Sequence, residues 1–178
     1  MTDLALAAQG GDRPALAELS RELQRPVYRL ALRFGGHPSD AEDIALEVML
    51  RLLTTLETYD GWSRFTLWVY ANAVRQLLRT EPRATEVAAT EGPTGTEDAL
   101  LRMSRERRVA YILSDLLGFT VADGAEIGAT DQATFHAWLT AARASLRPRT
   151  PVPDSDGAAP EAVWSRLVAT MPTHLGAR

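Results

Sequence analysis

Residues Phe119–Leu146 read FTVADGAEIGATDQATFHAWLTAARASL, and this stretch decides the fold prediction. Apolar residues recur at helical spacing on both sides of a short Gly/Thr break, which predicts two amphipathic helices joined by a tight turn. In such a helix-turn-helix the second helix normally lies in a DNA groove, where phosphates favour positive charge. This stretch contains Asp123, Glu126 and Asp131 but one basic residue, Arg143. The pattern of helices therefore indicates a DNA-reading motif, whereas the charge does not.

The composition of the whole chain limits the class of protein. A chain of 178 residues forms one or two small domains, and a hydrophobic content of 46% is typical of a globular protein. The net charge is −4, and every basic residue other than histidine is an arginine. The absence of cysteine excludes disulfides and thiolate zinc sites. Apolar runs are too short for a membrane span and no signal peptide is evident, so we expect a cytoplasmic protein with no membrane insertion.

The first block of sequence predicts three long helices. Apolar residues at three- and four-residue steps from Leu16 to Phe34 predict the first, which a Gly-Gly-His-Pro segment ends. Ser39-Asp40-Ala41-Glu42 has the spacing of a capping box and predicts the start of the second helix, which continues to about Leu56. A turn centred on Gly61 precedes the third, FTLWVYANAVRQLLR. No segment shows the sustained alternation of a β-strand, so the predicted fold is all-α.

The segment that follows divides the chain. Residues 80–97 are rich in Thr, Glu, Pro and Gly and predict a flexible linker. We therefore expect two small helical domains, at residues 1–79 and 98–147. A tail at 148–178 follows, in which Trp164, Leu167, Val168 and Met171 form a short apolar helical stripe. This stripe either packs as a terminal helix or docks into a groove.

Several stretches in order resemble the sigma-70 family, specifically the extracytoplasmic-function (ECF) sigma factors. DAEDIALEVMLRLL, at residues 40–53, is similar to the family pattern DAEDLVQEVFLRLL. YDGWSRFTLWVYANAV, at residues 59–74, resembles FDGRSSFRTWLYRIAR. Residues 107–146 align without a gap to the family's helix-turn-helix stretch. The resemblance implies a region 2-like bundle at 1–79 and a region 4-like helix-turn-helix at 98–147.

The family's known roles imply three sets of site residues. The acidic helix would bind the β′ coiled coil of RNA polymerase core, which is composed of β′ and β with other subunits. The next helix and the loop before it would capture flipped bases of the melted −10 promoter element, and the recognition helix would read the −35 element. The polymerase set is Asp40, Asp43, Glu47 and Arg51. The −10 set is Arg64, Phe65, Trp68, Tyr70 and Arg75. The −35 set is Thr134, His136, Ala137, Trp138 and Arg143.

Each set has a structural alternative. Aromatic faces beside an arginine suit single-stranded bases, but aromatic residues at helical spacing also form cores. Acidic residues near a helix start are also favoured by the helix dipole alone. In the recognition helix the family usually has basic residues at the positions of His136, Trp138 and Ala141, and Gly124 replaces an apolar core residue. Positions expected in the interior are largely kept, while positions expected to face ligands have lost positive charge.

Three functions compete on these observations. The first is a sigma factor that directs promoter-specific initiation with RNA polymerase core and promoter DNA. The second is a degenerate sigma-like regulator that binds an anti-sigma factor, an activator or polymerase without reading promoters; an exposed Trp138 on an acidic motif favours it. The third is an enzyme. Asp43 and Glu47 share a helix face that would suit a metal, but His37, His136 and His174 lack ligand spacing, so we expect no catalytic residues, metal or cofactor.

Overall fold

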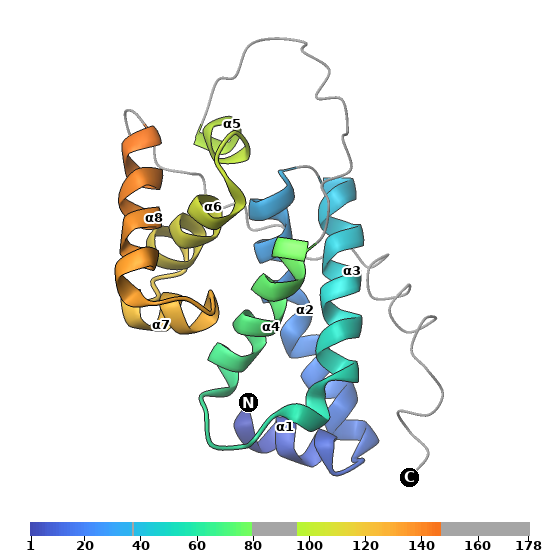
Figure 1. Cartoon of the computed structure of the whole chain (residues 1–178). Coiled ribbons are helices and arrows are strands. Elements are labelled where there is room, and N and C mark those ends of the chain that lie inside the picture. Colours follow the sequence, from blue (N-terminus) through green and yellow to red (C-terminus); the bar gives the residue numbers. More distant parts are fainter. Residues whose placement is uncertain (37, 80–95, 147–178) are drawn as a thin grey trace.

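The structure is a computed structural model that describes residues 1–36, 38–79 and 96–146, and all regular structure in these residues is helical (Figure 1). The all-α prediction is therefore confirmed. In chain order the elements are α1 (Thr2–Gln9), α2 (Arg13–Gly35), α3 (Pro38–Thr54), η1 (Leu56–Thr58), α4 (Phe65–Arg79), α5 (Thr96–Leu101), α6 (Arg105–Tyr111), η2 (Ile112–Leu116), α7 (Val121–Ile127) and α8 (Gln132–Ser145).

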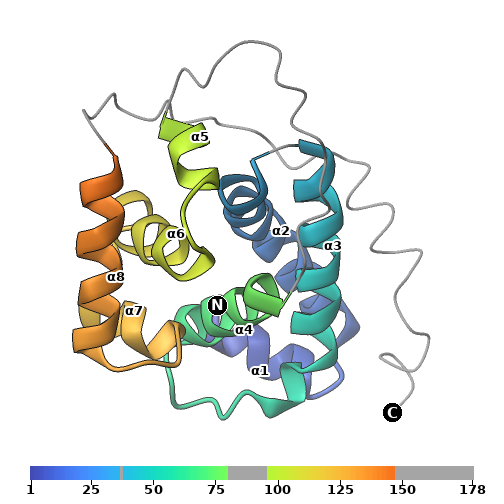
Figure 2. The same cartoon turned by 45° about the horizontal axis from the view of Figure 1, so that its top comes forward.

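Helix α2 is the longest element and organises the first half of the chain. Asp12 caps its start, because the carboxylate accepts a hydrogen bond from the backbone N–H of Ala15 at 3.0 Å. Gly36 ends it with φ of +79°, a left-handed conformation that suits glycine. Helix α3 then runs back along α2, and α4 packs on both (Figures 1 and 2). Since α3 begins at Pro38, Ser39 lies inside its first turn and does not precede the helix as the capping-box prediction required.

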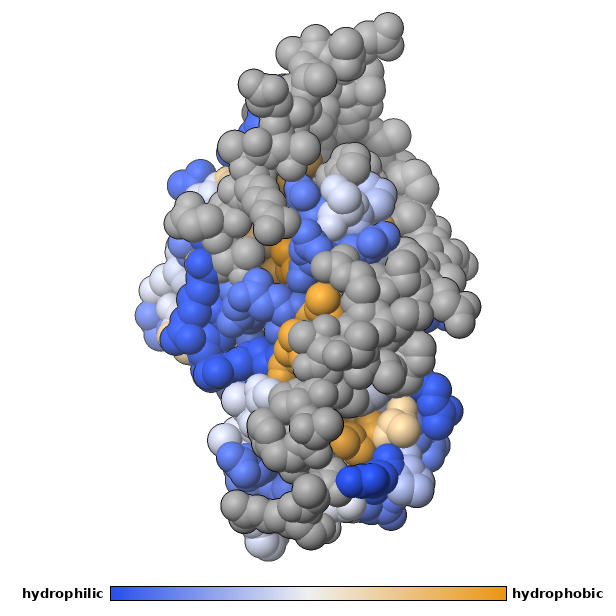
Figure 3. Space-filling model, turned by 90° about the vertical axis from the view of Figure 1, so that its right-hand side faces the viewer, coloured by the Kyte–Doolittle hydropathy of each residue, from blue (hydrophilic) through white to orange (hydrophobic). Residues whose placement is uncertain are grey.

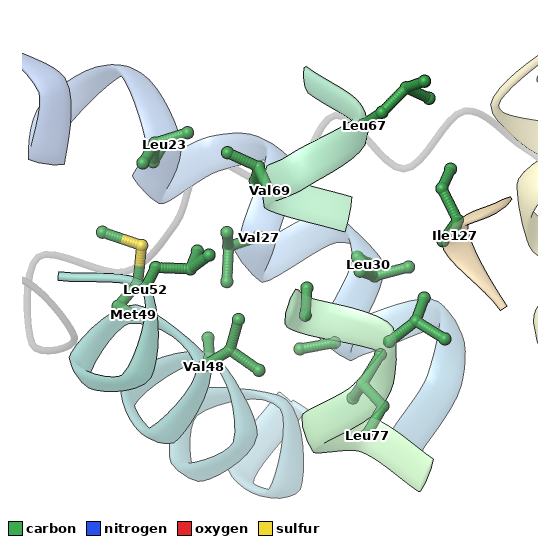
Figure 4. Packing of buried hydrophobic residues seen from close by; sticks show 14 of the residues in the cluster. Leu23, Val27, Leu30, Val48, Met49, Leu52, Leu67, Val69, Leu77 and Ile127 are labelled. Atoms are coloured by element: carbon green, nitrogen blue, oxygen red, sulfur yellow. The ribbon is translucent and has the colours of Figure 1, made fainter. Parts of the chain in front are cut away.

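The core of this half is built from the apolar faces of α2, α3 and α4 (Figure 4). In α2 and α3 the buried residues recur mainly at three- and four-residue steps, which gives one apolar stripe per helix, whereas α4 also buries Leu67 between Phe65 and Val69 and so has a wider apolar face. Figure 4 also shows Ile127 of α7 beside this cluster, so the core extends beyond the first half of the chain. The labelled members from the first half are Leu23, Val27, Leu30, Val48, Met49, Leu52, Leu67, Val69 and Leu77.

The predicted helix-turn-helix is present as α7 and α8. Thr120 and Asp123 form a reciprocal capping box at the start of α7. Asp131 caps α8 by accepting a hydrogen bond from the N–H of Thr134 at 2.8 Å. Phe135 of α8 is fully buried against α7. Local capping and one buried aromatic ring thus fix the geometry of this helix pair.

The two halves of the chain pack against each other in the described structure. Buried residues of α2, α3 and α4 belong to the same hydrophobic cluster as those of α6, η2, α7 and α8. Both views show α7 beside α4 (Figures 1 and 2). The rings of Tyr70 and Phe119 meet edge to face, with centroids 4.9 Å apart. Most of the predicted linker, residues 80–95, lies outside the described residues. His37 and the predicted tail helix also lie outside them.

Arg108 connects the second half to the end of α2. Its buried guanidinium donates hydrogen bonds to the carbonyl oxygens of Phe34 at 2.6 Å and Leu100 at 2.8 Å. Further bonds reach the carbonyls of Leu101 and Met103. The guanidinium also lies 5.1 Å from the centre of the Phe34 ring. Burial lowers the pKa of Arg108, and the nearby charge of Arg105 lowers it further.

Candidate polymerase and nucleic-acid interfaces

The four residues of α3 predicted to bind polymerase lie on the side of the helix away from its buried residues. Asp40 and Asp43 are half-buried, whereas Glu47 and Arg51 are exposed. Their spacing of three, four and four residues keeps them on one side of the helix. The side chain of Gln76 on α4 donates a hydrogen bond to Oε1 of Glu47 at 2.6 Å, which joins α4 to this surface. The structure therefore brings the four predicted polymerase-binding residues together on one helix.

Figure 3 views the molecule from the side on which α3 lies. Among the coloured residues, hydrophilic ones predominate and apolar ones form narrow strips. This distribution is ordinary for a protein surface and, by itself, identifies no binding site.

Two of the aromatic residues predicted to bind single-stranded DNA lie in a ring cluster. Tyr59 and Phe65 meet edge to face at 5.0 Å, and Phe65 stacks on Trp68 at 5.7 Å between centroids. Phe65 is only 2% exposed, so in this structure its ring belongs to the core and offers no face to a base. Trp68 is half-buried and retains part of its surface. For Phe65 the structure favours the core alternative.

The loop before α4 is held by hydrogen bonds from both ends. Oδ1 of Asp60 accepts from the backbone N–H groups of Trp62 at 3.0 Å and Ser63 at 3.1 Å, and from the Ser63 hydroxyl at 3.0 Å. These bonds, led by the one from the Ser63 N–H, lower the pKa of Asp60. The hydroxyl of Tyr59 donates to the carbonyl of Ser63 at 2.6 Å. The loop projects Trp62, which is 94% exposed.

Trp62 is absent from the residues that the sequence pattern selected. The sequence predicts the turn that contains Trp62. Hydrophobic periodicity, however, selects aromatic residues on helix faces and gives no information about an aromatic residue inside a turn. A signal was nevertheless available, because a large aromatic residue placed between Gly61 and Ser63 in a polar turn has little opportunity for burial.

Two other members of the −10 set contact the second half of the chain. Arg64 forms an ion pair and hydrogen bond with Asp123 at the start of α7. The Thr120 hydroxyl is the largest cause of the lowered pKa of Asp123, and Arg64 lowers it further. Tyr70 packs on Phe119, and burial raises the pKa of its phenol. Arg75 is exposed on α4 and lies apart from this contact.

Helix α8 exposes little charge. His136 and Ala137 are exposed, whereas Trp138 is half-buried and meets Phe135 with ring centroids 6.4 Å apart. The expectation of an exposed Trp138 is therefore wrong, because its ring packs against the core. The guanidinium of Arg143 is paired with the Asp115 carboxylate at 2.9 Å.

Thr134 is engaged at the start of the same helix. Its hydroxyl donates to Oδ2 of Asp131 at 2.7 Å, as part of the N-terminal cap. Of the five residues predicted to read the −35 element, Thr134, Trp138 and Arg143 thus make contacts within the described chain. His136 and Ala137 remain as the exposed members near the N-terminal part of α8.

Neither a metal site nor a membrane span is found in the part of the chain that the structure describes. Its described residues contain no group of three or more His, Cys, Asp or Glu side chains arranged to hold a metal ion. None of its described helices has the length and apolar character needed to cross a bilayer.

Comparison with known proteins identifies the family. Residues 19–83 match the model of sigma-70 region 2. The ECF RNA polymerase sigma factor SigM of Mycobacterium tuberculosis is 26% identical over 159 residues, which cover 81% of each chain. SigW of Bacillus subtilis, also an ECF sigma factor, is 31% identical over 91 residues, which cover 47% of this chain and 49% of SigW.

A solved structure agrees with the fold. CnrH, in its complex with the cytosolic domain of CnrY, superposes with a TM-score of 0.63 over 96% of this chain and 98% of CnrH, at 16% identity. This likeness is evidence for the arrangement of helices alone. The region 2 match and the similarity to SigM and SigW lead to one assignment: residues 19–83 are a sigma-70 region 2, and the chain is related to the ECF sigma factors.

Proposed function

We propose that this chain is an ECF-type RNA polymerase sigma factor that directs promoter-specific transcription initiation. The observation that carries the proposal is the region 2 match at residues 19–83, extended by similarity to SigM over 81% of both chains. Its partners are RNA polymerase core, promoter DNA and, for regulation, an anti-sigma factor. It works in the cytoplasm and has no catalytic activity of its own. Residues 1–79 act as region 2 and residues 98–147 as region 4.

The exposed side of α3 is the surface that we assign to polymerase. Asp40, Asp43, Glu47 and Arg51 share one helix face, and only Glu47 and Arg51 are exposed enough to dominate a contact. Charged residues at the edge of an interface mainly set orientation and the rate of association. Reversing the charge at Glu47 is therefore the most direct test of this surface.

The start of α4 and the loop before it form the surface that we assign to the melted −10 element. Arg64, Trp68, Tyr70 and Arg75 all retain some exposure, whereas Phe65 supports them from the core. Arg64 and Tyr70 contact the second half of the chain in the described structure. Binding of a DNA strand at these two residues would replace those contacts.

We assign the −35 element to the exposed side of α8, through Thr134, His136, Ala137, Trp138 and Arg143. This helix supplies little positive charge, and neutralisation of phosphates provides much of the affinity of DNA-binding modules. The free chain should therefore bind duplex DNA weakly. In the holoenzyme, attachment to polymerase raises the effective concentration of α8 at the promoter, so weak intrinsic binding is sufficient.

A reconstituted transcription assay tests this function. The full-length chain is mixed with RNA polymerase core, captured complexes are measured, and run-off transcripts are mapped on a library of genomic promoters. We expect stable capture and transcripts that start at a defined set of promoters. Capture without promoter-dependent transcripts would support the degenerate regulator instead, an alternative that none of the comparisons favours.

The α3 surface is tested in the same assay with a matched pair of variants. Glu47→Lys should weaken capture of core polymerase by about tenfold, equivalent to about 1.4 kcal/mol. Glu57→Lys makes the same charge change at an exposed position of η1 and should leave capture unchanged. Equal effects of the two variants would count against α3 as the polymerase surface.

A further inference from the structure

The hydrogen bonds inside the loop before α4 set its shape and leave its placement to other contacts. The Asp60 carboxylate accepts from the N–H groups of Trp62 and Ser63, and the Tyr59 hydroxyl donates to the Ser63 carbonyl. Each of these bonds joins two residues of the same short segment. Contacts with other elements must therefore determine where the loop lies relative to the core.

The side chain of Gln9, at the end of α1, makes such a contact. Its Nε2 donates to the carbonyl oxygens of Glu57 at 2.9 Å and Tyr59 at 3.0 Å, and a longer bond of 3.3 Å reaches the carbonyl of Leu56. An amide nitrogen has two hydrogens, so the two short bonds use both donors and the third bond is shared. Gln9 therefore holds the backbone of η1 and of the residue that follows it.

Helix α1 is a firm support for these bonds. Ala5 and Ala8 are buried, and α1 packs along α2. The same helix meets the loop at a second point, because a Cβ at Gly61 would lie 3.1 Å from the side chain of Leu6. The carbonyls that Gln9 holds are 47 to 50 positions away along the chain, so no local pattern in the sequence selects this residue.

Tyr59 connects the contact with α1 to the start of α4. Its ring is 2% exposed and lies 5.0 Å from the ring of Phe65 and 5.7 Å from that of Trp68, between centroids. The ring of Tyr59 is thus held by α4, while its carbonyl is held by α1. A change at Gln9 would therefore be transmitted through Tyr59 to the loop and to Arg64, the residue directly before α4.

We propose that Gln9 is a positioning residue for the −10 surface, which comprises the loop before α4 and the start of α4. By holding the carbonyls of Glu57 and Tyr59, it keeps the loop where Arg64 and Trp68 can reach a single DNA strand. Gln9 does not itself contact the strand. This inference rests on the proposed function, which assigns that surface to the melted −10 element.

The test uses reconstituted holoenzyme and a promoter mapped in the transcription assay. Two fluorescein-labelled probes carry this promoter, one fully duplex and one whose −10 element is an unpaired bubble. Wild-type holoenzyme should bind the bubble probe more tightly, and the ratio of the two affinities measures strand binding. Gln9→Met keeps a similar length and neutral charge but has no N–H donors. It should lower the ratio by about tenfold, the loss expected for one stacked base, with unchanged capture of core polymerase.

Two further variants separate the donors from other effects of the substitution. Gln24→Met makes the same change at a half-buried position of α2 and should alter neither the ratio nor capture. Gln9→Lys restores N–H donors at a similar reach and should keep most of the wild-type ratio. A residue that only stabilises the fold would lower capture and the affinity ratio together.

Three results would overturn the inference. The first is an affinity ratio in Gln9→Met equal to that of wild type, and the second is a parallel fall of the ratio and of polymerase capture. The third is a Gln9→Lys protein as impaired as Gln9→Met, because the donors would then not be the cause. Failure of the wild-type chain to capture polymerase or to start promoter-dependent transcripts would instead refute the proposed function, which is judged on wild type alone.

Discussion

Gly124 shows how one residue determines the packing of the helix-turn-helix. In the sequence it stands where the family has an apolar residue, and glycine inside a helix costs about 1 kcal/mol relative to alanine. In the structure a Cβ at this position would lie 2.2 Å from Cζ of Phe135 and 2.4 Å from Cε1. The glycine therefore leaves space for the buried ring of Phe135, which fills the volume that the family's apolar side chain at position 124 would occupy.

Gly124→Ala should consequently destabilise the protein in spite of alanine's higher helix propensity. Overpacking costs about 1–3 kcal/mol and the gain in helix propensity offsets about 1 kcal/mol, so we expect a net loss of up to about 2 kcal/mol in the free energy of unfolding, measured by urea denaturation. In a Phe135→Leu background the ring is gone, and the same substitution should be neutral or stabilising. An equal loss in both backgrounds would show that the ring is not the cause.

Helix α8, which we propose as the recognition helix, has a nearly uncharged exposed side. Its exposed His136 is a position where arginine can be added without disturbing the core. His136→Arg should raise the affinity of the full-length chain for duplex DNA. It should also steepen the slope of log K against log salt by about 0.9 for one added phosphate contact.

The control for this prediction is Ala17→Arg, which adds the same charge on the exposed side of α2. It should leave both the affinity and the salt slope near their wild-type values. Trp138→Arg is unsuitable for this purpose, because the half-buried ring packs on Phe135 and its loss would disturb the helix itself. An unchanged slope in His136→Arg would place α8 away from the DNA backbone.

The N-terminal caps of α7 and α8 predict how the helix pair responds to acid. Hydrogen bonds from Thr134, first from its side chain and then from its backbone, lower the pKa of Asp131 from the usual 3.8. A carboxylate whose pKa is lower in the folded state stabilises the fold above the unfolded-state value. That contribution is lost as the pH falls through the folded-state value, here below 3.8.

Asp131→Asn should keep the cap, because asparagine is an equally good N-cap residue, while removing the titration. We therefore expect the variant to match wild type near pH 7 and to lose less stability than wild type between pH 4 and 2, measured by far-UV circular dichroism during urea denaturation. Parallel losses in both proteins would show that Asp131 does not contribute to acid unfolding.

Sequence patterns predicted individual elements better than the contacts between them. Periodicity located the third long helix, and it coincides with α4 at Phe65–Arg79. Periodicity alone did not establish that Phe65 is buried, because the loop ahead of α4 sets which face turns inward. Arg108 was not singled out, since its bond to the Phe34 carbonyl joins residues 74 positions apart and leaves no local pattern.

At the scale of the whole molecule, the two halves share one hydrophobic cluster. Arg108 fastens them by donating to the carbonyl of Phe34 in α2 and to those of Leu100 and Leu101 in α5. A buried carbonyl that loses its donor costs about 1–3 kcal/mol. A domain pair connected only by a linker would unfold in two independent steps, whereas a shared core predicts one cooperative transition.

Two single-tryptophan proteins follow the halves separately, one retaining Trp68 in α4 and the other Trp138 in α8, with the remaining tryptophans changed to phenylalanine. Their urea denaturation curves should coincide. The single side-chain nitrogen of lysine cannot span the same carbonyls. Arg108→Lys should therefore lower the free energy of unfolding by about 1–3 kcal/mol and shift both denaturation curves together to lower urea concentration. Arg107→Lys, at an exposed position of the same helix, should change neither. A different result would contradict the shared core. If Arg108→Lys shifts the Trp138 curve and leaves the Trp68 curve in place, the two halves unfold independently and their packing is a contact between two domains.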